Sequence, residues 1–334
     1  MELIDEPIDI VITWVDGNDI LWQKKVKEYS INNFSLNTPA RYRDFGILKY
    51  CLRSIDEYLP WIHKVYLITD HQVPSYLNLN YEKLEIIDHR EFIPQCYLPT
   101  FNSNVIELNL YRIKSLSEKF ILMNDDMIID QPMKITDFFQ DEKVVDVSIF
   151  SPIFPRSQGI GKILSNNISI LNDNFSKREF VKKNFFKVYN LKYGKRLIKN
   201  FTMSPYKEFS GFYDPHVPIP YFKTLYKYVL EERAYDSFIR TCNHKFRSEL
   251  DINHWLVRYW QILTGNFVPR FDSETEYILM NNQKLLMKSL RNHKKKMLCI
   301  NDVSELKNYE YYVTQTISLL EKKFPNKSKF EIRD

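Results

Sequence analysis

The sequence predicts an α/β protein with a Rossmann-like, mostly parallel sheet, helices on both faces of that sheet and a mainly helical C-terminal half. The first 130 residues alternate between apolar runs of strand length and stretches with helical apolar spacing, as in doubly wound sheets. Several of these runs end in polar or acidic residues. The carboxyl ends of parallel strands meet at one edge, where such folds bind ligands, so we expect a site there.

The composition fits one large α/β domain, alone or with additions. The chain has 334 residues, of which 44% are hydrophobic, enough for a substantial core. Its net charge of +5 does not by itself indicate nucleic acid, and we recognise no nucleic-acid-binding module. The four cysteines lack a Cys-x-x-Cys pair and predict no zinc knuckle or disulfide framework. No apolar run approaches the roughly 18–20 residues that cross a bilayer, so we expect a cytoplasmic protein, with contact at the inner membrane face left open.

The first predicted strand is an apolar, β-branched run over residues 8–17 that ends in Asp16 and Gly17. Such a run is typical of a central parallel strand. In nucleotide-binding α/β folds the end of the first strand often delivers a polar residue to the base or ribose, and Trp14 is placed to pack on the same ligand. An ordinary Asp-Gly turn is the alternative interpretation.

A helix is predicted over residues 44–59, where apolar side chains have helical spacing and the helix must stop before Pro60. Arg41, Arg43 and Arg53 cluster around it. Because a planar guanidinium matches phosphate oxygens, one or more of these arginines is a candidate ligand for a diphosphate. Solvated surface arginines are the alternative interpretation.

A second helix is predicted over residues 103–116 from its apolar spacing. Asn102 or Ser103 can cap its free amides, and the same amides are suited to an anion. Two short strands precede it and end in polar residues at the presumed edge: residues 64–69, followed by Asp70, and residues 84–88, followed by His89.

The last strand of this half is a buried apolar run over residues 119–123 that stops at Asn124, Asp125 and Asp126. Adjacent carboxylates at such a strand end suit a hard divalent cation such as Mg²⁺ or Mn²⁺, and that cation in turn suits a phosphate-bearing substrate. A polar turn that merely ends a strand is the alternative.

The sequence resembles the Stealth family in several long motifs that occur in the family's order. That family includes bacterial capsular polysaccharide phosphotransferases and the animal lysosomal-enzyme N-acetylglucosamine-1-phosphotransferase. The resemblance implies a glycosyltransferase-A-like core for a nucleotide sugar. The motifs lie at Asp9 to Gly17, Arg41 to Asp44, Leu52 to Ile55, Pro60-Trp61, Leu98 to Ser103, Ile106-Glu107, Arg112-Ile113 and Phe120 to Asp126.

Two further motifs of that family are matched in the second half. His216 lies in the proline-rich residues 214–220, and Arg247 lies in residues 244–251. The resemblance implies that His216 is the general base and that Arg247 stabilises charge on a phosphoryl group. It leaves open which of Glu249 and Asp251 assists with the metal or with positioning.

The reaction implied by the resemblance is transfer of a hexose-1-phosphate or N-acetylhexosamine-1-phosphate from a UDP-sugar to a glycan hydroxyl, with release of UMP. A metal-dependent glycosyltransferase that releases UDP, or a non-catalytic glycan-binding protein, would have a similar sequence pattern. We expect Mg²⁺ or Mn²⁺ at Asp125 and Asp126, with Asp126 also catalytic. The residues expected around the donor are Trp14, Asp16, Gly17, Arg43, Arg53, Asn102 and Ser103.

Three parts of the chain are predicted: a nucleotide-sugar core at 1–150, a basic aromatic insertion or lid at 151–210, and a second half at 211–334 that completes the site. Residues 175–199 interleave basic and aromatic side chains, which suits an anionic membrane, an anionic acceptor glycan or a solvated lid. Residues 284–296 form a second basic stretch, which a lipid-linked acceptor would make useful at a membrane. The remaining expectations are an aromatic-rich helix over residues 252–264 and a last helix over 303–323, with a capping box of Asp302 and Glu305 and a stop at Pro325.

Overall fold

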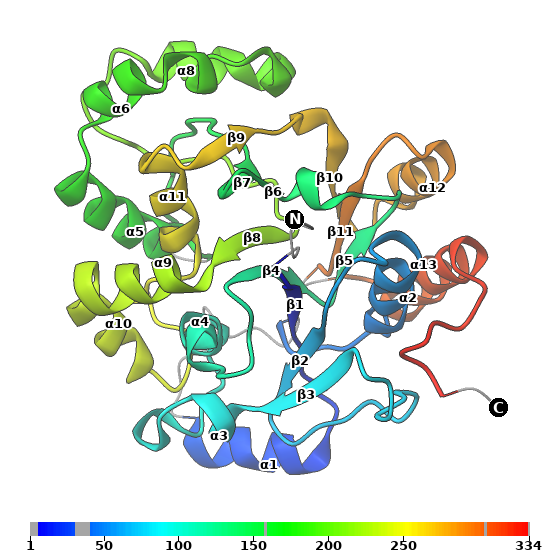
Figure 1. The fold of residues 1–334 in the computed structure, drawn as a ribbon. Helices are drawn as coiled ribbons and strands as arrows, with labels where there is room; N and C mark the ends of the chain where they lie inside the picture. The colour runs from blue at the N-terminus through cyan, green and yellow to red at the C-terminus, as the bar shows by residue number, and fades with distance from the viewer. Residues whose placement is uncertain (1–5, 31–40, 157–158, 304–305, 333–334) are drawn as a thin grey trace.

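The computed structural model describes residues 6–30, 41–156, 159–303 and 306–332. Its main sheet has the order β3-β2-β1-β4-β8 (Figure 1). Strands β1 to β4 pair in parallel, and β8 is an antiparallel edge strand. The predicted Rossmann-like α/β fold is therefore confirmed. The strands are β1 Ile8–Thr13, β2 Val65–Thr69, β3 Leu84–Asp88, β4 Lys119–Asn124 and β8 Ile219–Phe222.

Helices cover both sides of this sheet, with α2 and α13 on one side and α4, α9 and α10 on the other (Figure 1). Because both faces are covered, the central strand β1 is apolar along most of its length, and Ile10, Val11 and Ile12 are fully buried. The helices of the first half are α1 Ile20–Tyr29, α2 Leu48–Tyr58, α3 His89–Phe92 and α4 Ser103–Leu108. Those of the second half are α5 Gly161–Asn174, α6 Lys177–Lys183, α7 Phe185–Val188, α8 Leu197–Met203, α9 Lys223–Tyr228, α10 Tyr235–Cys242, α11 Trp255–Leu263, α12 Gln283–Asn292 and α13 Tyr309–Lys323.

Two small sheets extend the main one. The acidic pair forms a two-residue turn after β4, and the next strand, β5, leaves the main sheet to pair antiparallel with β11. The apolar run from residue 120 to residue 130 is therefore two strands of different sheets. This departure brings β11 beside the acidic pair. The small sheets consist of β10 Thr275–Leu279, β11 Met297–Asn301 and β5 Met127–Ile129, and of β6 Phe139–Gln140, β7 Lys143–Asp146 and β9 Phe267–Pro269.

Two predicted helices are shorter than expected. The helix expected over residues 103–116 stops at Leu108, because the side-chain amide of Asn109 donates to the Val105 carbonyl and competes with the backbone. The last helix begins at Tyr309 rather than residue 303. Its expected capping box is wrong in its first member, since Asp302 pairs with Arg43; Glu305 lies outside the described residues. The helices expected over residues 252–264 and 44–59 are present with closer bounds, as α11 Trp255–Leu263 and α2 Leu48–Tyr58, and the stop before Pro325 is confirmed.

The position of Arg53 contradicts its predicted role at the donor site. Its Nε and one terminal nitrogen each donate to Glu331 at 2.8 Å, and the other terminal nitrogen donates to the Phe324 carbonyl at 2.6 Å. The side chain is only 5% exposed. A guanidinium held in this way fastens the C-terminal residues to α2 and is directed at them rather than at a phosphate site.

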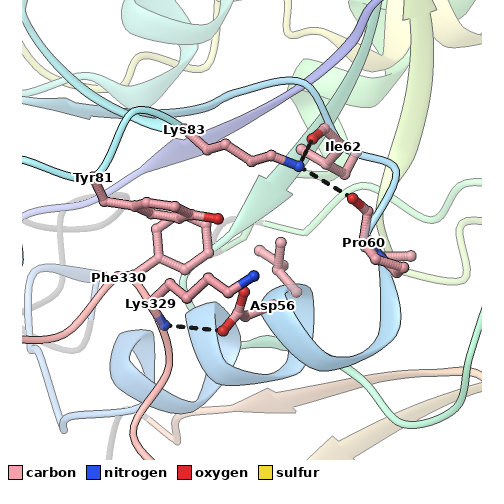
Figure 2. Close-up of a pocket in the computed structure, with 9 residues that line it drawn as sticks. Asp56, Pro60, Ile62, Tyr81, Lys83, Lys329 and Phe330 are labelled. Atoms are coloured by element: carbon pink, nitrogen blue, oxygen red, sulfur yellow. Dashed lines mark hydrogen bonds between the residues drawn. The ribbon is translucent and has the colours of Figure 1, made fainter.

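A small hollow of about 50 Å³ lies next to this clamp, between α2 and the C-terminal residues (Figure 2). Its polar groups are already bound within the chain: Lys83 donates to the carbonyls of Pro60 and Ile62, and the Lys329 backbone donates to Asp56. It is too small for a nucleotide sugar.

None of the helices that the structure describes combines the length and apolarity that crossing a bilayer requires.

Candidate active site

A cavity of about 530 Å³ opens at the carboxyl ends of β1, β2 and β4. The strand order reverses at β1, whose neighbours are β2 and β4, and open α/β sheets bind ligands at such a reversal. The volume lies in the range of small-molecule sites. The predicted site residues that line this cavity are Trp14, Arg43, Ser103, Asp125, Asp126, His216 and Arg247.

The acidic pair lies at the turn between β4 and β5. Asp126 Oδ2 accepts from Cys299 Sγ and Asn301 Nδ2, both at 3.3 Å, whereas its Oδ1 is buried and has no hydrogen-bond partner among the described residues. Burial raises the pKa of both carboxyls, and the charge of Asp126 further raises that of Asp125. Charged carboxylates in this arrangement need a nearby positive group.

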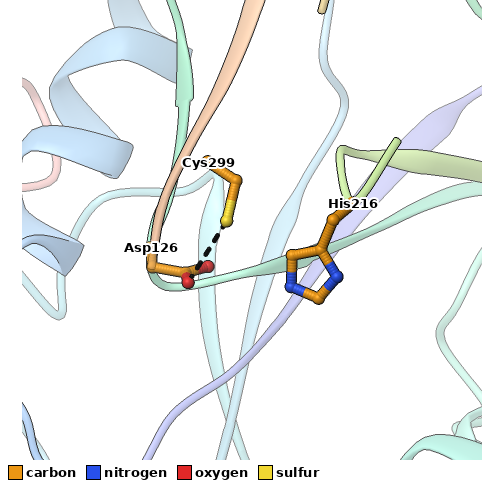
Figure 3. A group of neighbouring side chains, drawn as sticks. All are labelled: Asp126, His216 and Cys299. Carbon is orange, nitrogen blue, oxygen red and sulfur yellow. Dashed lines mark hydrogen bonds between the residues drawn. The ribbon is translucent and has the colours of Figure 1, made fainter. Parts of the chain in front are cut away.

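These carboxylates fit a hard divalent cation. Ligand atoms of Asp126, His216 and Cys299 lie within 4.8 Å of one another (Figure 3). Burial and the charge of Asp126 raise the pKa of the Cys299 thiol well above its usual value, so Cys299 stays protonated and is not the thiolate that a soft metal would select. The unpartnered oxygen of Asp126 and the adjacent Asp125 are the ligand type of Mg²⁺ or Mn²⁺.

His216 reaches the same cavity from the loop before β8. Its backbone has a φ of +51°, a conformation that is costly for a non-glycine residue and clusters at functional sites. Asp214 holds it in place, accepting the His216 backbone N–H at 3.0 Å and lying 3.7 Å from its Nδ1. Arg258 fixes Asp214 in turn at 3.1 Å.

The carboxylates around His216 favour the protonated form of its imidazole. Burial disfavours the charged form, but the bond to Asp214 and the charges of Asp214, Asp126 and Glu107 outweigh burial and raise the pKa of His216 to about 9. The ring therefore balances the buried carboxyls around it. It can accept a proton only after it has released its own.

Arg247 reaches the cavity through a hub built on Asp251. The fully buried carboxylate of Asp251 accepts from the amides of Asn102 and Asn104 at 2.8 and 3.0 Å and contacts His244 Nδ1 at 2.6 Å. These bonds hold residues 244–251 against the start of α4, where Arg247 donates to the Ser103 hydroxyl. Asp251 is thus a positioning residue. Glu249 instead forms a half-exposed pair with Lys162.

Three more residues expected around the donor do not line the cavity. Asn102 is fully buried and serves the Asp251 hub while capping α4. The Asp16 carboxylate accepts the Asn18 backbone N–H and shapes the loop after β1. Gly17 donates to the Tyr42 carbonyl at 2.8 Å, and a Cβ on Gly17 would lie 2.2 Å from that oxygen. Their direct contact with the donor is therefore not supported; they position residues that line the cavity.

Arg43 does line the cavity, but its charge is shared. One terminal nitrogen lies 2.8 Å from Asp302 Oδ2 and donates to the Val303 carbonyl, and the guanidinium stacks 4.3 Å from the Tyr309 ring. The Arg43 guanidinium is therefore held in one position at the rim.

Trp14 is mostly buried at the end of β1 and also lines the cavity.

Comparison with known proteins agrees with this architecture. Residues 6–33 match Stealth protein CR1, conserved region 1, and residues 41–147 match Stealth protein CR2, conserved region 2. A capsular polysaccharide phosphotransferase, WcwK of Streptococcus pneumoniae, is 43% identical over 331 residues, covering 98% of each chain.

The chain belongs to the Stealth family. The exopolysaccharide phosphotransferase cps2G of Lactiplantibacillus plantarum is 35% identical over 326 residues, covering 97% of this chain and 96% of that relative. Among solved structures, the galactosyltransferase LgtC with donor and acceptor sugar analogs is similar at a TM-score of 0.40 and 8% identity, covering 94% and 95% of the two chains. That similarity is too weak to carry a functional argument.

Glu107 also lines the cavity, although no role was predicted for it from the sequence. It is buried on α4, and burial raises its pKa to about 8. His254, which lies 3.7 Å from it, has a pKa lowered to about 3 by burial and stays neutral. Two signals were available: Glu107 belongs to the Ile106-Glu107 motif of the family resemblance, and it follows the expected cap Ser103 by four residues and shares its helix face.

Asn301 and Asp302 are the second omission. They end β11 beside Asp126 and line the cavity. The sequence Met-Leu-Cys-Ile-Asn-Asp of residues 297–302 repeats the pattern of an apolar strand that ends in Asn-Asp, as residues 120–125 do. That repetition could have identified them.

Proposed function

We propose that this protein transfers a sugar-1-phosphate, from a hexose or N-acetylhexosamine, from a UDP-sugar to a hydroxyl of a glycan and releases UMP. The observation that carries the proposal is one cavity that combines an acidic pair, with one Asp126 oxygen unpartnered among the described residues, a histidine held by a carboxylate, and an arginine. The names of the Stealth relatives, which are capsular and exopolysaccharide phosphotransferases, support the same reaction class.

The chemistry requires charge neutralisation and in-line geometry at the phosphorus next to the sugar. The acceptor oxygen attacks that phosphorus, the bond to the oxygen of UMP breaks, and a phosphodiester remains. Arg247 donates to the transferring phosphoryl group, and Arg43 faces the diphosphate from the rim. Mg²⁺ or Mn²⁺ held by Asp125 and Asp126 would neutralise diphosphate charge and orient its oxygens.

His216 in its neutral form accepts the proton of the attacking hydroxyl, while Asp214 orients its ring. Glu107 lies in the same cavity, where burial raises its pKa to about 8. The proposal further places the reaction in the cytoplasm, with a glycan acceptor that is lipid-linked at the inner membrane face.

Product analysis tests the proposal against the rival glycosyltransferase reaction. The full chain is incubated with a panel of UDP-sugars, Mg²⁺ and a glycan acceptor, and UMP, UDP and the new linkage are measured by chromatography and ³¹P NMR. We expect UMP and a phosphodiester signal with one donor. Release of UDP with a phosphorus-free linkage would show attack at the sugar carbon and overturn the phosphotransferase assignment.

A further inference from the structure

Exposed apolar side chains concentrate in residues 185–206. Helices α6 and α8 lie at the end of the molecule opposite α1 (Figure 1). Here Phe186 is 85% exposed and Leu191 is 86% exposed. Apolar exposure gathered in one place, unlike single exposed residues, marks an interaction surface. The other large apolar side chains exposed in this stretch are Phe185, Ile198, Phe201 and Tyr206.

Ring contacts join these residues into one surface. Phe185 contacts Phe186 at 5.6 Å and Tyr189 at 4.9 Å between ring centroids, and Tyr189 contacts Phe201 at 4.7 Å. Ile198 lies on α8 three residues before Phe201 and therefore on the same helix face. We call this surface the aromatic patch; it comprises Phe185, Phe186, Tyr189, Ile198 and Phe201, together with the exposed Leu191, which follows Tyr189 by two residues.

Positive charge surrounds the aromatic patch. Residues 177–199 contain nine lysines and arginines and one glutamate, a net charge of +8, whereas the whole chain carries +5. The rest of the protein is therefore net negative. Any partner that the patch selects by charge is anionic.

Some of these cations fasten the patch to the body of the protein. Lys177 donates to the carbonyls of Met203 and Tyr206, and Lys187 donates to that of Gly265. The apolar side chains are thus exposed on a fixed framework. Lys192 and Arg196 make the further links, to the Pro269 carbonyl and to Asp272. The basic side chains that remain exposed beside the patch are Arg178, Lys182, Lys183 and Lys195.

The second basic stretch, residues 284–296, differs from the first in its apolar side chains rather than in its charge. Lys296 pairs with Asp137 and Glu274 at 2.8 and 2.9 Å, and Lys295 pairs with Glu276 at 3.4 Å. Its other cations are exposed, as those beside the aromatic patch are: Lys284, Lys288, Arg291 and Lys294. None of the large apolar side chains described in residues 284–296 is exposed, so of the two stretches the one around the aromatic patch combines exposed cations with exposed rings.

We propose that the aromatic patch docks on an anionic lipid bilayer, with its rings in the headgroup boundary and its exposed lysines against anionic headgroups. Interfacial helices combine these two features, and each basic residue near the surface adds to binding. Residues Gly159 and Ile160, at the start of α5, line the cavity, and α6 follows the end of α5. Fourteen helical residues span about 20 Å, so α5 connects the cavity rim to the segment that carries the patch.

Vesicle sedimentation of the full chain tests the proposal. We expect binding to phosphatidylcholine vesicles that contain phosphatidylglycerol, little binding to pure phosphatidylcholine, and weaker binding as salt increases. The double substitution Phe186→Ser and Leu191→Ser lowers the partition coefficient about a hundredfold, because it removes two large inserted side chains. The matched control is Ile20→Ser with Leu21→Ser on α1, where the exposures are 68% and 73%, and this control keeps wild-type binding.

A charge pair separates the electrostatic contribution. Lys182→Gln with Lys195→Gln lowers binding roughly thirtyfold, whereas the control Lys24→Gln with Lys27→Gln on α1 does not. All the substituted side chains are exposed, so the melting temperatures of the variants should equal that of the wild type. Failure of the wild type to bind anionic vesicles, or equal loss in the α1 controls, overturns the proposal. So does a dimer in analytical ultracentrifugation that the Phe186 and Leu191 substitutions dissociate while vesicle binding persists, since the patch would then join two protein copies.

Discussion

Asp126 and Asp130 lie at the two ends of β5, and both are buried. Asp130 has a cation of its own, because Lys323 Nζ reaches it from α13 at 2.8 Å. Asp126 faces the cavity, and no lysine or arginine within the described ranges pairs with it. Asp130 is thus paired with a lysine of the fold, whereas Asp126 has only the nearby His216 ring and keeps one oxygen without a hydrogen-bond partner among the described residues, open to a group from outside. Both carboxylates are buried, so burial does not tell the structural one from the functional one. The presence of a lysine partner does.

Removal of the built-in cation has the largest expected effect. Lys323→Met leaves Asp130 buried without a positive partner, and breaking such a pair costs about 3–5 kcal/mol. The free energy of unfolding from denaturant titration measures this loss, and turnover per folded molecule stays at the wild-type level. Lys322→Met, an exposed neighbour, serves as the control. If both variants have the same stability, Asp130 does not depend on Lys323.

Asp126→Asn is expected to lower turnover without lowering stability. Loss of a group that positions charge at the reacting phosphoryl lowers turnover about 10²- to 10³-fold. Stability does not fall, because one buried carboxylate is gone. Steady-state kinetics and thermal melting are measured side by side with Asp130→Asn, which keeps its turnover. Near-normal turnover in Asp126→Asn would remove this residue from the site.

Addition of Mg²⁺ sharpens the comparison without an activity assay. A ligand at one hundred times its Kd stabilises the folded state by about 2.7 kcal/mol, so the melting temperature of the wild type rises. Asp126→Asn loses this rise and Asp130→Asn retains it. Chelation with EDTA reverses it in the wild type. An equal rise in both variants would place cation binding elsewhere.

The pH dependence of stability tests the Arg53 clamp. Burial alone would raise the pKa of Glu331, but its bonds to Arg53 and Ser328 lower it below the ordinary value of 4.5. The clamp therefore stabilises the folded state above about pH 4.5 and loses this contribution as pH falls through the folded pKa. Arg53→Met should be less stable than wild type by about 1.5–3 kcal/mol at pH 7, with a smaller difference at pH 4. A difference that is the same at both values would contradict the ion pair.

Much of the fold follows from local patterns. The four parallel strands were predictable because buried runs such as residues 10–12 and 120–123 are continuous and apolar, and the acidic pair was predictable because it follows one of them abruptly. The ends of helices were less predictable. Asn109 stops α4 through a side-chain bond that competes with the helix, and spacing does not reveal that competition.

Long-range partners explain the rest. Arg53 and Arg43 have the same chemistry and lie ten residues apart, yet one is bound to Glu331 and the other lines the cavity. What decides between them is the C-terminal segment, which lies far from both in the sequence. Asn102 likewise looked like a ligand and serves Asp251, 149 residues later. Local sequence carries the residue type but not its distant partner.

The position of β11 has a consequence for how related genes are read. The two conserved regions that match this chain end at residue 147, and the further family motifs end at residue 251, yet one wall of the cavity comes from residues 301 and 302. A frameshift or early stop after residue 290 would leave every diagnostic region intact and remove that wall. Such an allele would still be assigned to the family while encoding a protein with an incomplete cavity.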